Sequence, residues 1–239
     1  MQLERQNKFN IFPQQFTKNL CESVDGINGG PRIYTTIYGN QYPSITSILS
    51  ATMSTQKKDI LDDWKAREGE ENAEKIKVAA SDRGSFLHNI IEKYLFGDEE
   101  FYILLKAASP KLKRLFNQVK PYLDKNVNNI RLLEKPLFSD TLKIAGKVDM
   151  VAEYNRKLSV VDFKTSTRVK TLDMIDDYLI QETFYSYAYA ENFCEKIEQI
   201  VTIIATENSL KPYIYIQTPR EHLHDLNNRI NQYYKQKRG

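Results

Sequence analysis

Two stretches near the middle of the chain have the pattern of a β-hairpin. Val, Ile and Tyr dominate Ile144–Tyr154 and Leu158–Phe163, and the polar residues Asn155-Arg156-Lys157 separate them as a predicted turn. Residues equally far from a turn face each other across an antiparallel pair, with Cβ atoms about 4.5–5.5 Å apart. With the turn centred between the first two of its three residues, Asp149 faces Asp162. The pattern therefore predicts two carboxylates side by side on neighbouring strands.

Hydrophobic periodicity predicts helices before and after this hairpin and further strands beside it. The predicted N-terminal elements are an irregular arm over residues 1–31, a hairpin over Arg32–Ile37 that turns at Gly39-Asn40, a helix from Ser44 through Leu49, helices over Lys57–Phe96, and a helical stretch over Asp98–Leu133 interrupted at Pro110 and Pro121. The predicted C-terminal elements are strands over Arg131–Ser139, Ile200–Ala205 and Tyr213–Gln217, a helix over Asp176–Phe193, and a closing helix over Pro219–Lys237.

This order of elements predicts an α/β (mixed α+β) fold, in which helices flank a mixed central sheet. We expect one compact unit with two regions. Residues 1–128 form an N-terminal arm and helical region, and residues 129–239 form the core that carries the sheet.

Composition narrows the class of protein. The chain has 239 residues, of which 41% are hydrophobic and 11% aromatic, which is enough for a substantial core. Its net charge of +3 is mild, so binding to a nucleic acid would require a local basic surface. No apolar run approaches the ~20 residues that span a bilayer, and no signal peptide opens the chain. We expect a cytoplasmic protein with no membrane partner, and Glu4 with few Ser or Arg around it argues against mitochondrial targeting.

The predicted hairpin also carries a lysine beside its second aspartate. Lys164 follows Asp162 by two positions, so both side chains project from one face of the strand, with Cα atoms about 6–7 Å apart. Magnesium prefers oxygen ligands, commonly one or two carboxylates together with water and phosphate oxygens. Asp149, Asp162 and Lys164 therefore form a candidate site for a divalent cation and a phosphate group. The alternative is a solvated surface ion pair, but Val160-Val161 precede Asp162 as buried strand and favour the site.

These residues resemble a known nuclease motif. Gly146-Lys147-Val148-Asp149, followed by Asp162-Phe163-Lys164-Thr165, resembles the core motif of the PD-(D/E)XK nuclease superfamily in its RecB-like branch. Further segments match that branch in order and rough spacing: Gly84-Ser85-Phe86-Leu87-His88, Leu133-Glu134-Lys135-Pro136 and Gln181-Glu182-Thr183-Phe184-Tyr185. The chain also resembles the mitochondrial genome maintenance exonuclease family and its phage relatives between about residues 42 and 190, at Tyr42–Leu49, Thr52-Met53, Trp64-Lys65 and Val151–Tyr154. The resemblance implies a restriction-endonuclease-like core and a metal-dependent deoxyribonuclease that acts on single-stranded DNA ends.

The resemblance also implies roles for residues outside the aspartate pair. It places His88 in the metal site, whereas a histidine bordering an apolar helical stripe is more often a packed or capping residue. It makes Glu134 a metal ligand or water anchor, with a surface strand glutamate as an equally good alternative, and it allows the backbone carbonyl of Phe163 to face the metal. Gln181 and Tyr185 lie at i and i+4 on one helix face. The resemblance implies that both are catalytic residues lining the active site.

Basic and hydroxyl side chains around the motif are candidate contacts to DNA. Such groups bind phosphates, and these contacts fix the register of a nucleic acid without reading its sequence. The candidates are Lys147, Thr165, Ser166, Arg168 and Lys170, together with Tyr185, which could contact a base or a phosphate. The alternative for the segment after the catalytic strand is an ordinary polar loop.

The predicted function is exonucleolytic hydrolysis of single-stranded DNA with Mg²⁺ or Mn²⁺, in replication, recombination or repair. The expected partners are single-stranded DNA and replication or recombination proteins, and we expect a monomer, of bacterial or phage origin. Two cysteines are too few for the four-cysteine iron–sulfur cluster of some RecB-like nucleases. Two alternatives stay open: a structure-specific endonuclease of the same fold, and a catalytically silent module that binds single-stranded DNA.

Overall fold

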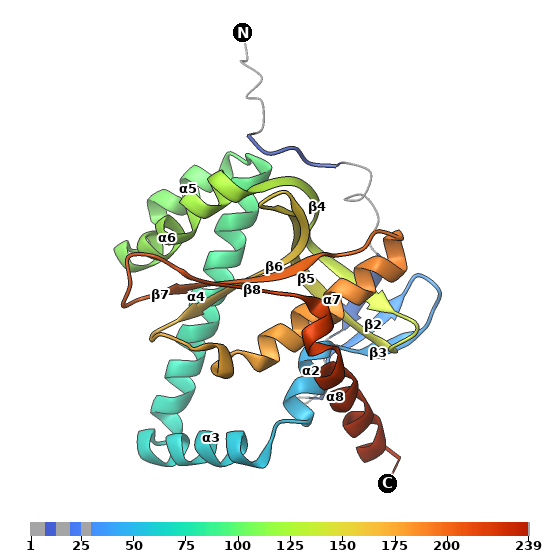
Figure 1. The fold of residues 1–239 in the computed structure, drawn as a ribbon. Coiled ribbons are helices and arrows are strands. Elements are labelled where there is room, and N and C mark those ends of the chain that lie inside the picture. The colour runs from blue at the N-terminus through green and yellow to red at the C-terminus, as the bar shows by residue number, and fades with distance from the viewer. Residues whose placement is uncertain (1–7, 13–19, 25–29, 239) are drawn as a thin grey trace.

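A five-stranded mixed sheet forms the centre of the molecule (Figure 1). The computed structural model describes residues 8–12, 20–24 and 30–238. The strands lie side by side in chain order: β4 (Val127–Ser139), β5 (Ile144–Tyr154), β6 (Lys157–Ser166), β7 (Gln199–Thr206) and β8 (Tyr213–Gln217). Three neighbouring pairs are antiparallel, and β6 and β7 run parallel. The predicted mixed sheet flanked by helices is therefore confirmed.

Helices cover both faces of this sheet, and each face has its own apolar core. One core packs the sheet against α4 (Glu70–Phe96), α5 (Glu100–Ala107) and α6 (Pro110–Asn126). The other packs it against α2 (Ile45–Ala51), α7 (Asp176–Phe193) and α8 (Leu223–Gln236). Alternate residues of β6 divide between the two cores, because Val160 belongs to the α7 side and Val161 and Phe163 to the α4 side. On a strand buried on both faces, a polar group costs free energy unless its hydrogen bonds are satisfied.

Smaller elements surround this arrangement. A three-stranded sheet packs beside α2, and two short 3₁₀ turns precede α7 and α8; these elements are β1 (Cys21–Val24), β2 (Ile33–Thr36), β3 (Gln41–Pro43), η2 (Leu172–Met174) and η3 (Pro219–His222). Helix α3 (Thr55–Glu68) lies apart from the core, at the far end of α4 (Figure 1). None of the α3 residues is buried, and Gly69, with φ 78°, connects α3 to α4. No helix in the described part of the chain combines the length and apolar character needed to cross a bilayer.

The central hairpin has the predicted register. Tyr154 pairs with Lys157 and Met150 with Val161, which is the alignment that a turn centred between Asn155 and Arg156 requires. Those two turn residues have φ angles of 53° and 66°, the left-handed conformation of a two-residue hairpin turn. Lys157 was predicted to lie in the turn, but it is the first residue of β6, because a turn of this type needs only two residues.

Other local predictions agree with the structure. Ser44 is the N-cap of α2, since its side chain accepts a hydrogen bond from the Ser47 N–H at 3.0 Å. The predicted helix Asp176–Phe193 coincides with α7, and the strand Tyr213–Gln217 with β8. The N-terminal segment was predicted to be an irregular arm, but Cys21–Val24 forms β1, which pairs with β2; most of the arm lies outside the described residues.

The predictions around residues 121–133 were wrong. Pro121 does not interrupt a helix but lies inside α6. Because proline has no N–H, the Asn117 carbonyl one turn earlier loses its helical hydrogen bond. Both residues are exposed, so water can replace that bond. A helix was also predicted to reach Leu133, whereas β4 begins at Val127 because the residues after α6 pair with the far end of β5. The predicted boundary between residues 128 and 129 thus falls inside β4, and α6 passes directly into the sheet.

Two glycines of the predicted motifs have opposite surroundings, which gives a matched test of the packing. A Cβ atom on Gly146 would lie 3.0 Å from the Tyr185 ring and hydroxyl and 3.2 Å from Ile45, whereas a Cβ on Gly84 would meet nothing within 4 Å. We expect Gly146→Ala to lower the free energy of unfolding by about 1–3 kcal/mol through overpacking. Gly84→Ala should raise it by about 0.5–1 kcal/mol, because alanine favours the helix.

Urea unfolding of both variants, followed by far-ultraviolet circular dichroism, would measure the two changes. An unchanged free energy of unfolding for Gly146→Ala would contradict the close approach of β5 to α7.

Candidate active site

Strands β5 and β6 stop pairing next to the predicted aspartates. Their last pair is Met150 with Val161; beyond it, β5 continues beside β4 as far as Ile144, and β6 continues beside β7 as far as Ser166. At the first step past that pair, the Phe163 N–H donates a hydrogen bond to Asp149 Oδ2 at 2.8 Å. A side chain thus takes the place of the backbone ladder, and the two strands diverge from this point.

The three residues of the predicted pair-and-lysine motif come together at this divergence. Asp149 and Asp162 are 7% and 1% exposed, so both carboxylates are buried. The ammonium group of Lys164 forms an ion pair with Asp162 Oδ2. Asp162 Oδ1 has no hydrogen-bond partner among the described residues, which is unusual for a buried carboxylate oxygen.

Two further predicted residues complete a compact group of possible metal ligands. His88 Nδ1, from α4, lies 3.2 Å from Glu134 Oε1 of β4 and 3.5 Å from Asp149 Oδ1. One ligand atom from each of these three residues lies within 4.8 Å of the others. Imidazole and carboxylate groups at this spacing suit a divalent cation. These three residues therefore fit a bound metal ion.

The backbone of Glu134 has an unfavourable conformation for a non-glycine residue. It lies between Leu133 and Lys135, which pair with Met150 and Val148, so it stands opposite Asp149 across the β4–β5 ladder. Its φ angle of 51° is in the left-handed region, which costs a non-glycine residue of order 1–3 kcal/mol. The predicted surface-strand alternative is not what the structure shows, since the side chain is 11% exposed and turned toward His88.

The electrostatics of the group follow from burying several charges together. Burial lowers the pKa of His88, but the Asp149 and Glu134 carboxylates outweigh burial and raise that pKa to about 9. Burial and the neighbouring Asp162 raise the pKa of Asp149 to about 7. For Lys164 burial opposes the charged form, yet Asp162 and Asp149 hold its pKa above the usual range. Without a metal ion, the protein therefore compensates its carboxylates with His88 and Lys164.

Of the predicted helix pair, Gln181 and Tyr185 contact each other. Gln181 Nε2 donates a hydrogen bond to the Tyr185 hydroxyl at 3.0 Å, as their i and i+4 spacing predicts. Tyr185 is only 2% exposed and packs against Gly146. The ring is therefore packed in the interior and its hydroxyl orients Gln181, while the contact of Tyr185 with a base or phosphate stays a prediction.

The predicted DNA contacts lie around the divergence but differ in exposure. Lys147, 53% exposed, forms an ion pair with Glu134, and Thr165 is half-buried. Ser166 is buried and accepts a hydrogen bond from the Arg168 N–H at 3.3 Å, which leaves the Arg168 side chain exposed. Lys170 donates to the Tyr178 hydroxyl at 2.6 Å. Lys147 lies on β5, whereas Thr165 and Ser166 end the strand that carries Lys164, and Arg168 and Lys170 follow it.

Two residues near the site were not identified from the sequence. The Tyr178 ring centroid lies 5.1 Å from Lys164 Nζ and 4.7 Å from Lys170 Nζ, so one aromatic face links both cations. Glu182, beside Gln181, is completely buried and accepts a hydrogen bond from Thr202. The available sequence signal for Glu182 was a charge on α7 between the apolar residues Ile180 and Phe184; for Tyr178 the sequence carried none.

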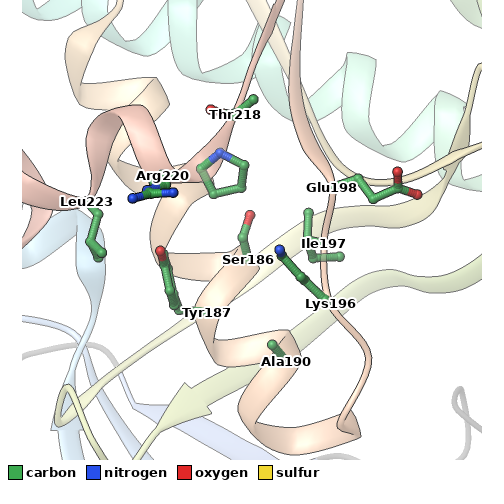
Figure 2. Close-up of a pocket in the computed structure, with 10 residues that line it drawn as sticks. Ser186, Tyr187, Ala190, Lys196, Ile197, Glu198, Thr218, Arg220 and Leu223 are labelled. Atoms are coloured by element: carbon green, nitrogen blue, oxygen red, sulfur yellow. The ribbon is translucent and has the colours of Figure 1, made fainter.

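A separate groove lies along the second half of α7 (Figure 2). Its volume is about 420 Å³, and its lining comes from α7, the segment before β7, and the start of α8 with η3: Ser186, Tyr187, Ala190, Lys196, Ile197, Glu198, Thr218, Pro219, Arg220 and Leu223. Figure 2 shows Lys196 directed toward Ser186 and the Glu198 carboxylate directed away from them. None of these ten residues is a site residue of the strand divergence, so the groove is not the catalytic cleft.

Comparison with known proteins identifies the relatives of this chain. The PD-(D/E)XK nuclease superfamily matches residues 63–236. "Mitochondrial genome maintenance exonuclease 1" of Homo sapiens is 32% identical over 149 residues, which cover 61% of this chain and 40% of the human protein. The Mus musculus protein of the same name is 28% identical over 137 residues, covering 56% and 39%. The match therefore spans about two fifths of each curated relative.

Among solved structures, a crystal structure of a candidate exonuclease from Eubacterium rectale is similar to this chain with a TM-score of 0.41 and 14% sequence identity. The similarity covers 64% of this chain and 66% of the other.

The buried Asp149 carboxylate is expected to favour metal binding and, in the absence of a metal ion, to lower the stability of the folded protein. Because the pKa of Asp149 is raised in the folded protein, its ionised form destabilises the metal-free fold fully above pH 7, and the effect disappears as pH falls toward the ordinary value of 3.8. We expect Asp149→Asn to raise Tm in EDTA at pH 8 by at least about 2 °C. The same variant should lose the stabilisation that Mn²⁺ gives the unmodified protein.

Thermal unfolding with and without Mn²⁺ would test this, with the exposed Asp82 on α4 changed to Asn as a control that should alter neither value. A lower Tm for Asp149→Asn in EDTA would show that the carboxylate is not under repulsion.

Proposed function

Because this chain belongs to the PD-(D/E)XK nuclease superfamily, we propose that it is a metal-dependent exonuclease that hydrolyses single-stranded DNA from free ends. The observation that carries the proposal is the gathering of His88, Glu134, Asp149, Asp162 and Lys164 at the divergence of β5 and β6. Four elements supply these side chains, so the group is a product of the fold. The human and mouse relatives, which are named as exonucleases, support the same activity.

Mg²⁺ or Mn²⁺ is the cation that the donor set suits. His88, Glu134 and Asp149 would hold it, with Asp162 and the Phe163 carbonyl as the further oxygen donors of the proposal. The imidazole of His88 favours a transition ion and explains why Mn²⁺ is included beside Mg²⁺. When bound, such a cation stabilises negative charge on a phosphate and lowers the pKa of water.

Lys164 has a role that follows from its surroundings. Its ammonium group is held against Asp162, and the raised pKa keeps it protonated at neutral pH. A protonated lysine cannot take a proton from water, so it does not act as a general base. It donates hydrogen bonds, which orient the attacking water and neutralise charge that develops on the scissile phosphate.

Single-stranded DNA is the substrate that the surroundings of the site favour. Exposed aliphatic and thioether side chains occur on α3, the first half of α4 and the segment before α7: Ile60, Leu61, Ile76, Val78, Val169, Leu172 and Met174. The faces of unpaired bases are apolar, so these side chains offer them a contact that does not depend on sequence. Lys57 of α3 forms ion pairs with Asp176 and Asp177 of α7 at 3.1 and 3.3 Å, which ties the start of α3 to the catalytic side.

A comparison of linear and closed circular single-stranded DNA tests the activity. With Mg²⁺ or Mn²⁺, we expect end-labelled linear DNA to be degraded and circular DNA of the same sequence to resist, because hydrolysis begins at an end. Lys164→Ala should lower kcat by at least about 100-fold, the scale for losing a group that stabilises transition-state charge. Lys157→Ala, an exposed lysine at the opposite end of β6, is the matched control and should leave the rate unchanged.

Cleavage of the circular substrate at a comparable rate would replace the exonuclease by an endonuclease of the same fold. No turnover with either metal, together with tight binding of single-stranded DNA, would favour a silent binding module.

Arg168 offers a test of the DNA contacts. Its side chain is exposed next to the catalytic strand, where it can neutralise one phosphate. In a Lys164→Ala background, Arg168→Ala should weaken binding of single-stranded oligonucleotides of different sequence to a similar extent. The slope of log Kd against log salt concentration should become shallower by about 0.7. Fluorescence anisotropy measures both, with Arg220→Ala in the groove of Figure 2 as the control. An unchanged slope for Arg168→Ala would remove Arg168 from the DNA-binding surface.

A further inference from the structure

Glu182 is a buried acid at the active site that the proposed mechanism does not use. It lies on α7 next to Gln181, and its side chain is 0% exposed. Burying a carboxyl group without full hydrogen bonding is costly, so its presence in the interior calls for a function. The neighbouring buried residues of α7 are apolar or hydroxyl-bearing, and none of them would require an acid for packing.

The sheet register places Glu182 beside Asp162. Thr202 of β7 pairs with Asp162 of β6, so the two side chains share one face of the sheet on strands about 4.8 Å apart. The Thr202 hydroxyl donates a hydrogen bond to Glu182 Oε1 at 2.5 Å. The carboxyl group of Glu182, on α7, therefore contacts Thr202, which is the cross-strand neighbour of Asp162.

Three buried carboxyl oxygens in this region have no hydrogen-bond partner within the described residues: Glu182 Oε2 and both oxygens of Asp162. Asp162 Oδ2 forms an ion pair with Lys164, whereas no ion pair is formed by Asp162 Oδ1 or Glu182 Oε2 within the described residues. Both side chains are closed to solvent, since Glu182 is 0% and Asp162 1% exposed, and Thr202 adjoins both of them.

Other roles for Glu182 fit less well. A side chain with no exposed surface cannot touch the substrate. Its action on the reaction must therefore pass through its neighbours.

We propose that Glu182 is a positioning residue, which, anchored by Thr202, supplies a hydrogen bond to Asp162 on the side that faces α7. This bond fixes the orientation of Asp162 and keeps its carboxylate available to the cation and to Lys164. The expected effect of Glu182 on catalysis rests on the proposed function. Its expected effect on metal affinity does not require that the protein cleave DNA. Hydrogen-bond partners of metal-binding carboxylates act in this way, and their loss costs about 10–100-fold in metal affinity or activity.

Two substitutions at Glu182 separate hydrogen bonding from charge. Glu182→Leu has a similar volume but no hydrogen-bonding group, and it should lower kcat and Mn²⁺ affinity at least about 10-fold with little change in KM. Glu182→Gln keeps an acceptor for Thr202 and gains an NH₂ donor, so it should recover most of both losses. Ser186→Ala, one turn along α7, removes a buried hydroxyl that bonds only the Glu182 carbonyl, and serves as the control for a general effect on the helix.

Isothermal titration calorimetry with Mn²⁺ alone measures the metal affinity without DNA, and single-turnover degradation measures kcat. If the unmodified protein does not cleave DNA but its Mn²⁺ affinity falls in Glu182→Leu and returns in Glu182→Gln, the nuclease proposal fails and the positioning role stands. Equal losses in both Glu182 variants, or no loss in either, would overturn the positioning role. If Glu182→Leu does not fold, Thr202→Val replaces it. This variant removes the hydroxyl that bonds Glu182 and should also lower Mn²⁺ affinity. An unchanged affinity would overturn the proposal.

Discussion

One hydrogen bond determines where the chemistry of this protein can occur. The Phe163 N–H, which a regular ladder would pair with β5 backbone, is bound instead by the Asp149 carboxylate. The pairing of β5 and β6 ends there, and each strand continues beside its other neighbour. The resulting divergence brings Asp149 and Asp162 together inside the sheet, where solvent cannot screen them. His88, Glu134 and Lys164 approach from separate elements, and without the divergence they would meet a continuous ladder with no access for a cation.

The residues of the site repel one another, and the surrounding fold keeps them together. Several carboxylates share a buried space, and Glu134 adopts a left-handed backbone conformation within a strand. Each of these features opposes folding, and the sheet maintains them because apolar cores cover both of its faces. A scaffold that is over-determined by packing can support a few unfavourable groups at one point. A divalent cation bound at the proposed site would neutralise the same carboxylates and relieve their repulsion.

Local patterns were sufficient to predict part of this structure. The register of the central hairpin depends on a two-residue turn and on alternation, and α2 and α7 depend on a cap and on periodicity, so all are encoded within short segments. The start of β4 at Val127 and the continuity of α6 through Pro121 depend on distant partners and on which side faces solvent, and a single sequence does not contain that information. The same distinction applies to the site. Asp149, Asp162 and Lys164 were found from spacing and resemblance, whereas Tyr178 and Glu182 acquire meaning only once α7 is packed over β6 and β7. Tyr185 was placed correctly in the helix, but its burial under Gly146 came from packing.

Helix α3 contributes nothing to the apolar cores that hold the other helices against the sheet. It buries none of its residues, and its connection to α4 passes through a glycine. Its sequence is consequently free of the constraints that an interior imposes. Natural variation or deliberate exchange at the exposed positions of Thr55–Glu68 can therefore proceed while the architecture that generates the carboxylate cluster is preserved. In this molecule, tolerance to sequence change and structural integrity reside in different parts of one polypeptide.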